Sequence, residues 1–530
     1  MLPARKDVAD MPLAIELIRR GYFPRELPPP FSTDSLAGYA DSILANLLAV
    51  LPGNEPARLL THALGRPGRL TRLLGIPNPI WHLRLCLAVE QNWAALLAAS
   101  NNSPLSLSKP AESLPPGRAI VRSPGISSRP ISRAESRAGG QFTLVADISR
   151  FYPSVYTHSL PWALHTKATA KAQRNNQQLL GNHLDWLIRQ AQDGQSVGLP
   201  IGPDTSHVMA ETVLSALDVA LGAGLPGLRG SRYVDDYDLT FQGRAEAETG
   251  LHLLQRLLQG YGLALNPSKT KILELPEPLD DLWVSELRTW PLRSHPLAQR
   301  NDLASFFGRA FVLSKVKPDA PVLQYAVARM SSVEVEPANW PIYQALLLQC
   351  VPSQVGTLPF IFAQLAKYQQ RGISPGKQLL ERALNEHIVR HCLLGYASEV
   401  AWAIWGLMAY GCSIHEEAGT ALSDIDDSIV ALLALDARQR GTFLHAPNVG
   451  RWAASMTPED LLGDQWLLAY EANIKNWLPS VGGGDHVAAV PGFHALKQAA
   501  VSFYDGTLVA PIVPAAAIPQ GGPVMYAAPP

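Results

Sequence analysis

The order of elements predicted between Phe142 and Ile272 constrains the fold of this chain more than any other feature. Residues 142–148 form an almost continuous apolar run, which is typical of a strand buried on both faces of a sheet. A helical region, a hairpin over residues 231–241, an amphipathic helix over residues 245–260 and a further strand follow in that order. Strand, helix, hairpin, helix and strand together predict a ferredoxin-like α+β unit.

Three aspartates fall at the ends of these predicted strands. Asp147 closes the apolar run, and Asp235 and Asp236 lie together at the turn of the hairpin, directly after Tyr233-Val234. Adjacent carboxylates are costly to bury unless a cation lies between them. Mg²⁺ takes hard oxygen ligands and is usually held by one or two carboxylates together with substrate phosphates. The pattern therefore predicts a magnesium site, and the alternative is a solvated Asp-Asp turn.

The N-terminal part of the chain divides into two regions of different composition. Residues 1–102 are predicted to form helices broken by Pro-rich turns, whereas residues 103–140 are rich in Ser, Pro, Gly and Arg. The second region has few acids, Glu112 and Glu135, and five arginines: Arg118, Arg122, Arg129, Arg133 and Arg137. This excess of positive charge predicts a surface that contacts phosphates, with a solvated arginine-rich loop as the alternative.

The C-terminal part is predicted to be helical. Over residues 301–485, stripes of Leu and Ala at helical spacing are separated by short Gly or Pro breaks, which predicts an all-α helical-repeat (HEAT-like) domain. The clearest predicted helices cover residues 359–370, 377–394, 397–410 and 423–440. Residues 486–530 are assigned to a Pro-, Ala- and Gly-rich tail, disordered from about residue 511.

Composition limits the remaining possibilities. A chain of 530 residues predicts two to four domains, and a formal net charge of −1 means that any polyanion must be met by a local basic patch. The four cysteines are widely separated, which predicts buried thiols of a cytoplasmic protein and no zinc or disulfide framework. Residues 1–7 do not resemble a signal peptide, and the apolar run over residues 400–412 is too short to span a bilayer, which predicts a buried helix and no membrane partner.

Four stretches of the chain resemble the palm of reverse transcriptases. They occur in the order typical of that family, between about residues 118 and 275: Val145–Val155, Gly198–Ser206, Tyr233–Asp236 and Leu265–Thr270. The string Pro-Ile-Gly-Pro-Asp-Thr-Ser at 200–206 and the helical C-terminal region look most like the abortive-infection, defence-associated bacterial branch, the AbiK-like enzymes. The resemblance implies right-hand polymerase fingers and palm over residues 103–300, part of the fingers within residues 1–102, and a helical-repeat domain in place of a thumb.

The resemblance also implies the metal chemistry. Extension of DNA requires attack of a terminal oxygen on the α-phosphate of a dNTP, and two Mg²⁺ ions, or Mn²⁺, stabilise the charge on both oxygens. Asp147 and Asp235 match the bridging ligands, and the backbone carbonyl of Ile148 matches an additional ligand. Consecutive residues of a strand point to opposite faces, so Asp236 is assigned the secondary role.

Further residues match nucleotide-binding positions of the family. Tyr152, beside Phe151, matches the steric gate that excludes a 2′-hydroxyl, with ordinary core packing as the alternative. Lys269 aligns with the lysine that protonates pyrophosphate, and Lys271 is the alternative. Guanidinium groups suit bidentate phosphate contact, so two arginines are assigned to the triphosphate. The complete predicted nucleotide-binding set is Ile148, Phe151, Tyr152, Gly202, Arg129 and Arg122.

Ile201 departs from the pattern of templated reverse transcriptases, which have a glutamine before the glycine matched by Gly202. This departure predicts a metal-dependent DNA polymerase that adds dNTPs without a template. The resemblance to the AbiK-like enzymes further implies priming by one of the protein's own tyrosines, a role in bacterial anti-phage defence and assembly as a homo-oligomer. The enzyme's product would be single-stranded DNA attached to that tyrosine, for which Tyr22 and Tyr526 are candidates. The alternatives are a templated enzyme that copies a dedicated non-coding RNA and a catalytically silent scaffold that binds a phage or host protein.

Two further pairs have the R-x-x-x-x-H spacing of a ribonuclease motif found in HEPN domains. They are Arg382 with His387 and Arg440 with His445. A chain with fourteen histidines produces about one such match by chance, so both pairs are predicted to lie on helix surfaces.

Overall fold

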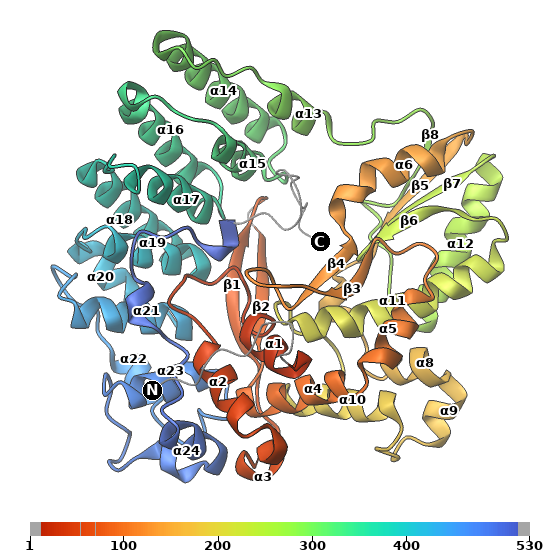
Figure 1. Ribbon diagram of the computed structural model, residues 1–530, viewed down its shortest axis with the longest axis horizontal. Coiled ribbons are helices and arrows are strands. Elements are labelled where there is room, and N and C mark those ends of the chain that lie inside the picture. The colour runs from red at the N-terminus through yellow and green to blue at the C-terminus, as the bar shows by residue number, and fades with distance from the viewer. Residues whose placement is uncertain (1–11, 53–54, 69, 518–530) are drawn as a thin grey trace.

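The structure, a computed structural model, describes residues 12–52, 55–68 and 70–517 (Figure 1). Its central element is a four-stranded antiparallel sheet in the order β6-β7-β5-β8. The strands are β5 (Phe142–Asp147), β6 (Arg229–Tyr233), β7 (Asp236–Phe241) and β8 (Lys271–Glu274). Helices α7 to α11 connect β5 to β6, and α12 connects β7 to β8. This order and these connections are those of the predicted ferredoxin-like unit.

Helices pack on and around this sheet. Helix α12 (Arg244–Gly260) contacts β5 and β7 through the predicted apolar side, and α11 (Asp204–Gly224) packs against α12. The remaining helices of the crossover are α7 (Phe151–Ser154), α8 (Ser159–His165), α9 (Lys167–Ala172) and α10 (Leu180–Gln190). Asp147 at the end of β5 and Asp236 at the start of β7 are register partners, and α7 begins four residues after Asp147, so the crossover leaves the sheet from the end that carries the aspartates.

The arginine-rich region is more ordered than the predicted loop. It folds into a hairpin of β3 (Ser108–Glu112) and β4 (Ile120–Pro124), followed by α6 (Arg129–Arg137). The segment before β3 extends the palm sheet at its β6 edge, because Leu107 N donates to the Arg232 carbonyl and Arg232 N donates to the Leu105 carbonyl, each at 2.8 Å. These arginines are therefore held against the palm.

The N-terminal region contains the predicted helices and one hairpin that was not predicted. The helices are α1 (Leu13–Arg20), α2 (Asp34–Ser42), α3 (Leu47–Val50), α4 (Pro79–Gln91) and α5 (Trp93–Asn101). The hairpin consists of β1 (Leu60–Arg66) and β2 (Leu70–Ile76), and it lies between the palm and the C-terminal helices (Figure 1). Pro67-Gly68, a strong turn signal between two Leu- and Thr-containing segments, is the sequence feature that could have revealed it.

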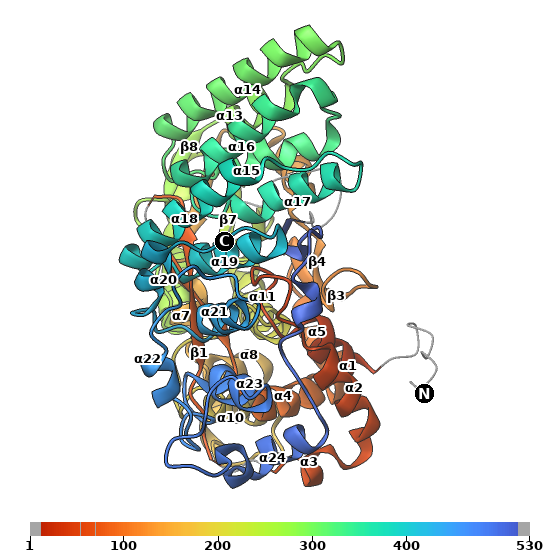
Figure 2. The ribbon, with the colours of Figure 1, turned by 90° about the vertical axis from the view of Figure 1, so that its left-hand side faces the viewer.

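The C-terminal helices form an arc along one side of the molecule, coloured green to blue in Figures 1 and 2. They are α13 (Leu282–Thr289), α14 (Pro296–Val316), α15 (Val322–Arg329), α16 (Trp340–Ser353), α17 (Leu358–Gln369), α18 (Lys377–Leu394), α19 (Ala397–Ala409), α20 (Glu416–Leu422), α21 (Ser428–Gln439), α22 (Gly450–Ala454), α23 (Trp466–Ile474) and α24 (Pro491–Gln498). Several of them pack on their next-but-one neighbour, such as α16 on α18 and α19 on α21. The bounds of α17, α18 and α19 lie within one residue of the prediction. The HEAT-like repeat remains a prediction.

The predicted tail is wrong for residues 486–517, which are folded. Phe493, Leu496, Phe503 and Tyr504 are buried in the core. Extended residues pair with the N-terminal region, because Ser32 N donates to the Phe503 carbonyl at 3.1 Å. Pro and Ala content alone misled the prediction, since the few aromatic residues of this segment supply its buried surface.

The remaining predictions concern the N-terminus, the priming candidate Tyr526 and the apolar run over residues 400–412. Residues 1–7 and Tyr526 lie outside the described residues. Helix α19, which covers most of the apolar run 400–412, is buried as predicted. Within the described parts of the chain, no helix has both the length and the apolarity needed to cross a bilayer.

Candidate active site

Asp147 ends β5 and anchors the site. It is buried and lies opposite Asp236 of β7 in the strand register. Its Oδ1 accepts a hydrogen bond from Asn266 Nδ2 at 3.1 Å, and its Oδ2 accepts from Lys269 Nζ at 2.9 Å. The loop that carries these partners is held along β5, since Asn266 N donates to the Asp147 carbonyl at 2.8 Å. The structure thus brings Lys269, rather than Lys271 on β8, to the aspartate.

The second and third aspartates belong to the tight turn between β6 and β7. Tyr233 and Asp236 are the last paired residues, and Val234 and Asp235 form the turn. Val234 has a φ of 52°, which is unfavourable for a β-branched residue and must be held by its surroundings. Asp235 is therefore a turn residue. The sequence prediction separated Asp235 from Asp236 by the alternation of side chains along a strand, and this reason does not apply to a turn residue.

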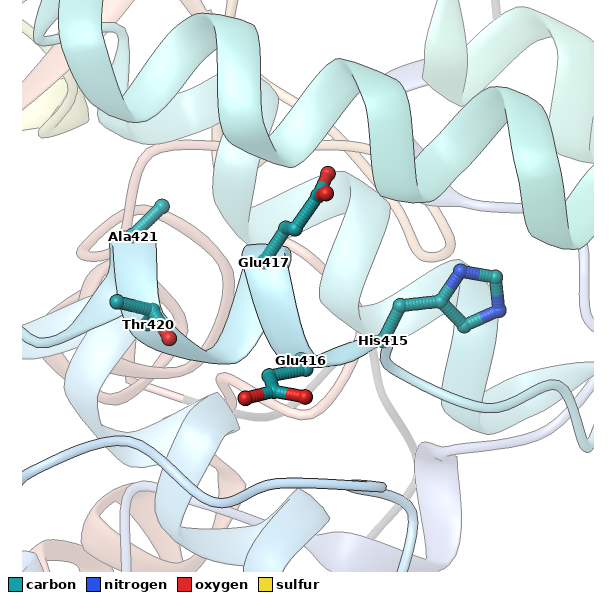
Figure 3. A pocket seen from close by; sticks show the side chains of 5 residues that line it. All are labelled: His415, Glu416, Glu417, Thr420 and Ala421. Atoms are coloured by element: carbon teal, nitrogen blue, oxygen red, sulfur yellow. The ribbon is translucent and has the colours of Figure 1, made fainter.

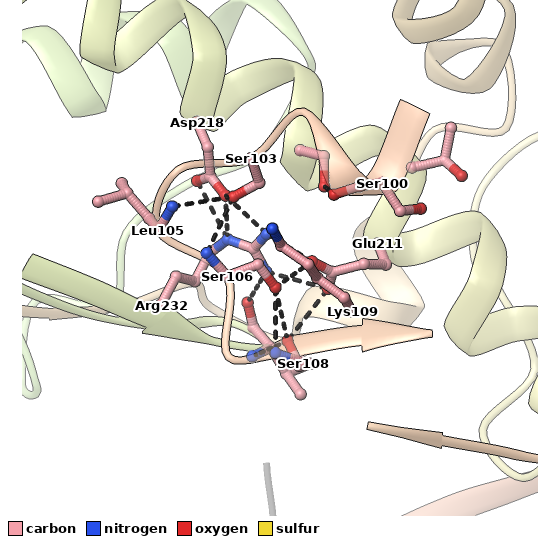
Figure 4. Close-up of polar contacts among 12 residues, drawn as sticks. Ser100, Ser103, Leu105, Ser106, Ser108, Lys109, Glu211, Asp218 and Arg232 are labelled. Atoms are coloured by element: carbon pink, nitrogen blue, oxygen red, sulfur yellow. Dashed lines mark hydrogen bonds and ion pairs between the residues drawn. The ribbon is translucent and has the colours of Figure 1, made fainter. Parts of the chain in front are cut away.

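A buried polar network holds this turn (Figure 4). Arg232 forms ion pairs with Glu211 and Asp218 of α11, each at 2.7 Å. Its Nη1 also donates to the Val234 carbonyl at 2.9 Å, and Val234 N donates to Ser108 Oγ at 2.9 Å. Both backbone groups of the strained residue are thus satisfied from a network in which the charges are paired.

The three carboxylates act on one another electrostatically. Burial, Asp236 and Asp147 together raise the pKa of Asp235 to about 7, against the opposing charge of Lys269. Burial also raises the pKa of Asp236, and its ion pair with Arg129 at 3.2 Å opposes this shift. Such shifts are typical of functional sites, where clustered charges are kept at a cost in stability.

The donor set suits a divalent cation of the magnesium type. Asp235 Oδ1 is buried and has no hydrogen-bond partner among the described residues. The potential metal ligands beside it, the carboxylates of Asp147 and Asp236, are hard oxygens. Arg129 and Lys269 contact the other two aspartates. As the side chains stand, no three His, Cys, Asp or Glu residues in the described ranges are grouped closely enough to hold a metal ion. The fit therefore rests on donor chemistry and on the unsatisfied oxygen.

A cavity of about 2220 Å³ opens beside the aspartates. Tyr152 and Phe151 of α7 line it, and their rings meet edge to face with centroids 5.3 Å apart. Leu199 N donates to the Tyr152 carbonyl at 2.8 Å, which fixes α7 against the loop that includes Ile201. The aromatic pair therefore lies on the cavity wall next to Asp147 and Asp235.

Among the arginines of the wall that were not predicted are Arg66 and Arg72 of the β1–β2 hairpin. Burial and the charge of Arg66 lower the pKa of Arg72 to about 10, while Asp235 and Tyr152 oppose this shift. Arg72 is thus within electrostatic reach of the acidic turn and remains charged at neutral pH. Prediction of the hairpin would have placed these arginines near the site.

Two predicted nucleotide-binding residues do not line this cavity. Gly202 has a φ of 139° and packs so closely on Pro24 that an added Cβ would lie 2.5 Å from its Cγ. The Gly202 carbonyl accepts from Arg118 Nη2 at 2.7 Å. Arg122 lies behind the wall and contacts Tyr233. Gly202 thus has a backbone role, and Arg122 is directed away from the expected triphosphate site.

The predicted basic surface is largely neutralised by acids from other elements. Arg118 pairs with Asp204, and Arg133 and Arg137 both pair with Asp238, each at 2.8 Å. The sequence prediction counted only acids nearby in the chain, whereas these partners come from α11 and β7. Arg129, Arg133 and Arg137 nevertheless line the cavity.

The structure also places the priming candidate Tyr22 and the two R-x-x-x-x-H pairs. The Tyr22 hydroxyl is buried and donates to the Pro77 carbonyl, so it does not fit a priming role. His387 is buried with Nε2 3.0 Å from Glu399, which contradicts its predicted place on a helix surface. Arg440 donates to Asp436 and to the Gly506 carbonyl, whereas His445 is exposed.

A second depression, of about 810 Å³, lies at the start of α20 (Figure 3). Its lining consists of His415, Glu416, Glu417, Thr420 and Ala421. The two glutamate side chains point in different directions, and His415 Nε2 is 2.9 Å from Glu381 Oε1. These groups do not converge on a common point, so this depression does not rival the aspartate cavity.

Comparison with known proteins agrees with this geometry. Residues 95–299 match the family described as reverse transcriptase (RNA-dependent DNA polymerase). That segment is close to the predicted range 103–300 and contains the palm sheet, the three aspartates, Tyr152 and Lys269. The chain therefore carries a reverse transcriptase domain, and the activity that this domain implies is nucleotide polymerisation.

No curated protein matches the chain. Among solved structures, it is similar to telomerase from Candida albicans in complex with the TWJ fragment of telomeric RNA, at 12% identity and a TM-score of 0.29, over 69% of this chain and 70% of that one. It is also similar to apo telomerase from Candida tropicalis, at 11% identity and a TM-score of 0.33, over 79% of this chain and 73% of that one.

Proposed function

We propose that this protein is a metal-dependent DNA polymerase that joins dNTPs to a terminal oxygen. The observation that carries the proposal is the meeting of Asp147, Asp235 and Lys269 at one end of a cavity lined by Tyr152. A silent scaffold would have no use for an aspartate whose oxygen is buried without a hydrogen-bond partner in the described part of the chain.

The residues support specific roles in this reaction. Two Mg²⁺ ions, or Mn²⁺, held by Asp147, Asp235, Asp236 and the Ile148 carbonyl would stabilise charge on the attacking and leaving oxygens. Lys269 is 58% exposed at its side chain, so its ammonium can turn from Asp147 and give a proton to the leaving pyrophosphate. Arg129 and Arg72, both on the wall, would bind the triphosphate.

Tyr152 supports the proposal that the substrates are deoxyribonucleotides rather than ribonucleotides. Its buried ring forms part of the wall beside Asp147 and Asp235. A bulky aromatic ring at that position leaves no room for a 2′-hydroxyl, so the proposed substrates are dNTPs.

We further propose that synthesis does not require a template. Ile201 lies on the wall, where it has no amide to position a template base, and its carbonyl accepts from Gly75 N at 2.8 Å. The cavity lining carries acids as well as arginines, among them Glu286 of α13 paired with Arg309 of α14, so its positive charge is partly offset, whereas a long duplex favours a strongly basic lining. A single strand is therefore the proposed product.

Protein priming, homo-oligomer formation, location in the cytoplasm and a role in anti-phage defence rest on the resemblance to AbiK-like enzymes. The buried hydroxyl of Tyr22 removes one of the two priming candidates. Plating of phage on cells that express the wild type or an inactive variant tests the defence role.

One experiment separates the alternatives. Purified protein is incubated with Mg²⁺ and each labelled dNTP, with and without nuclease pretreatment. Label that stays covalently on the protein after pretreatment supports untemplated, protein-primed synthesis, whereas incorporation that requires added RNA supports a templated enzyme. Absence of incorporation under every condition would favour the scaffold, and Asp235→Asn serves as the inactive control.

A further inference from the structure

Helix α6 is attached to the palm by arginines and not by apolar packing. None of its side chains, all of which the structure describes, is buried, and its branched residue Ile131 is 62% exposed. Arg129, Arg133 and Arg137 recur at every fourth position, so they lie along one side of the helix. The helix contacts β6 and β7 of the palm sheet. Its place on the sheet therefore depends on the ion pairs of this side.

Asp238 of β7 receives two of these arginines. Arg133 Nε and Arg137 Nη2 both donate to its Oδ2 at 2.8 Å, and Thr143 Oγ1 of β5 donates to its Oδ1 at 2.9 Å. The aspartate is 1% exposed and does not line the cavity. Charge-assisted hydrogen bonds are the strong ones, and loss of one member of a buried pair leaves the other unpaired. Asp238 is thus the anchor of α6 on the palm.

The two anchored arginines are also held on their other side. Arg133 Nη1 donates to the Leu279 carbonyl at 2.7 Å, and Arg137 Nη1 donates to the Pro278 carbonyl at 3.2 Å. Both guanidinium groups are therefore fixed between β7 and the segment that follows β8. Arg129, one turn earlier on α6, has a longer contact, from its Nη1 to Asp236 Oδ2 at 3.2 Å. It is the α6 arginine best able to exchange its partner for a phosphate.

The acids of β7 repeat the spacing of the arginines. Asp236 and Asp238 are alternate residues of one strand, so they lie on the same face of the sheet. Asp236 belongs to the acidic turn and Asp238 lies one step behind it. With α6 fixed at Asp238, the Arg129 guanidinium is held at the end of the cavity that carries the aspartates.

We infer that Asp238 is a positioning residue that anchors α6 through Arg133 and Arg137 and so holds Arg129 in place to bind the triphosphate. This inference rests on the proposed function, which assigns Arg129 to the triphosphate. A guanidinium binds phosphate through donors of fixed direction, and misplacement of a group by about 1 Å has large effects on a bound substrate. Loss of the anchor would let the helix shift and weaken that contact.

The test measures how tightly the full chain binds inorganic triphosphate in the presence of Mg²⁺, by isothermal titration calorimetry. Asp238→Asn keeps the shape of the side chain and removes its charge. We expect it to weaken triphosphate binding by about tenfold, the equivalent of one charged hydrogen bond. Arg129→Met should weaken binding at least as much, and the double variant should bind no more weakly than Arg129→Met, because Asp238 acts through Arg129.

Two further variants separate positioning from a general loss of structure. Asp436→Asn changes a buried aspartate that pairs with Arg440 at 2.9 Å and does not line the cavity. It should lower the midpoint of thermal unfolding about as much as Asp238→Asn does, with the triphosphate affinity of the wild type. Arg133→Met leaves Asp238 paired with Arg137 and replaces Asp238→Asn if that variant does not fold. Its effect should vanish in the Arg129→Met background, whereas direct phosphate contact by Arg133 would make the two effects additive.

The outcomes distinguish this inference from the proposed function. Triphosphate affinity that is unchanged or higher in Asp238→Asn, or equally reduced in Asp436→Asn, would overturn the positioning role. Additive effects with Arg129→Met, or a wild type that binds no triphosphate, would do the same. If the wild type binds triphosphate through Arg129 but incorporates no dNTP, the polymerase proposal fails while these affinities still decide the inference. Incorporation of dNTPs together with unchanged affinity in Asp238→Asn would keep the polymerase and refute the inference.

Discussion

At the scale of single residues, Asp235 of the proposed metal site occupies an electrostatically unfavourable position. Its neighbours Asp236 and Asp147 and its burial hold its pKa at about 7, well above the ordinary value near 3.9. The folded protein therefore binds more protons than the unfolded chain between about pH 4 and pH 7. It follows that folding stability falls as the pH rises through this range.

Asp235→Asn should consequently separate activity from stability. Incorporation of dNTPs should fall by about 10²-fold or more, because a neutral amide replaces a charged ligand. In the presence of EDTA, the midpoint of thermal unfolding should be higher in the variant than in the wild type at pH 8, and the difference should shrink toward pH 4. Asp193→Asn, at an exposed acid of the same cavity, should change neither the incorporation of dNTPs nor the midpoint of thermal unfolding. An Asp235→Asn variant that remains active would refute the proposed site.

Lys269 and Lys271 provide a second comparison at this scale. Lys269 Nζ is 2.9 Å from Asp147, whereas Lys271 is an exposed residue of β8. Lys269→Ala should lower kcat by about 10²-fold, as expected for loss of a general acid, and Lys271→Ala should leave kcat within about twofold. Steady-state incorporation measures both, and the reverse result would give the catalytic role to Lys271.

At the scale of elements, the acidic turn depends on a bond from the neighbouring β3 strand. Ser108 Oγ accepts from Val234 N, whereas Ser106 in the same network contacts Glu211 but not Val234. Ser108→Ala should lower kcat about tenfold with a loss of about 1 kcal/mol in the free energy of unfolding, because the turn loses its anchor. Ser106→Ala is the matched control: a similar loss of stability with little change in kcat supports this explanation, and equal losses of kcat would contradict it.

Elements with a strong local pattern could be predicted from the sequence. The strand ending at Asp147, the hairpin at Asp235 and the helices over residues 358–394 all have clear periodicity or a continuous apolar run. The β1–β2 hairpin lacked such a pattern, since it contains arginine, histidine and glycine and is stabilised partly by distant partners. His62 of β1, for example, lies 2.8 Å from Asp427 of the C-terminal region, a pairing that no local window contains.

The same limit applied to the site. The three aspartates, Tyr152 and Lys269 could be proposed as site residues because they lie in ordered motifs. Arg72 was not among the predicted residues because its hairpin was not predicted, and Arg122 contacts Tyr233, far along the chain, and does not line the cavity. Position within a motif can be read from sequence, whereas the direction of a side chain needs the packing around it.

At the scale of the whole molecule, the chain closes on itself around the cavity. The β1–β2 hairpin packs on α19 and α21, and Gly65 N donates to Ser398 Oγ at 3.1 Å. The C-terminal segment returns to the N-terminal region, where Asp505 N donates to the Pro30 carbonyl at 2.7 Å. The N-terminal region, including the β1–β2 hairpin that lines the cavity, is thus held at two places by the C-terminal region.

Glu471 ties this C-terminal segment down and makes the closure sensitive to pH. Its Oε1 accepts from Phe503 N at 2.5 Å and its Oε2 from Ser502 Oγ at 3.1 Å. Burial raises its pKa to about 7, against the opposing effects of Lys475 and these hydrogen bonds. A raised pKa means that the folded state binds the extra proton, so this stabilisation is present below about pH 4 and is lost as the pH rises through 7.

Glu471→Gln should therefore reduce the dependence of stability on pH. The wild type should lose on the order of 1–3 kcal/mol through this residue between pH 5 and pH 8, whereas the neutral amide keeps an acceptor for Phe503 N without carrying a charge. Thermal unfolding at both pH values measures the difference, with Glu459→Gln as an exposed control. This segment joins the C-terminal region to the N-terminal region. A wild type equally stable at both pH values, or a variant with an unchanged pH dependence, would show that Glu471 does not govern this closure.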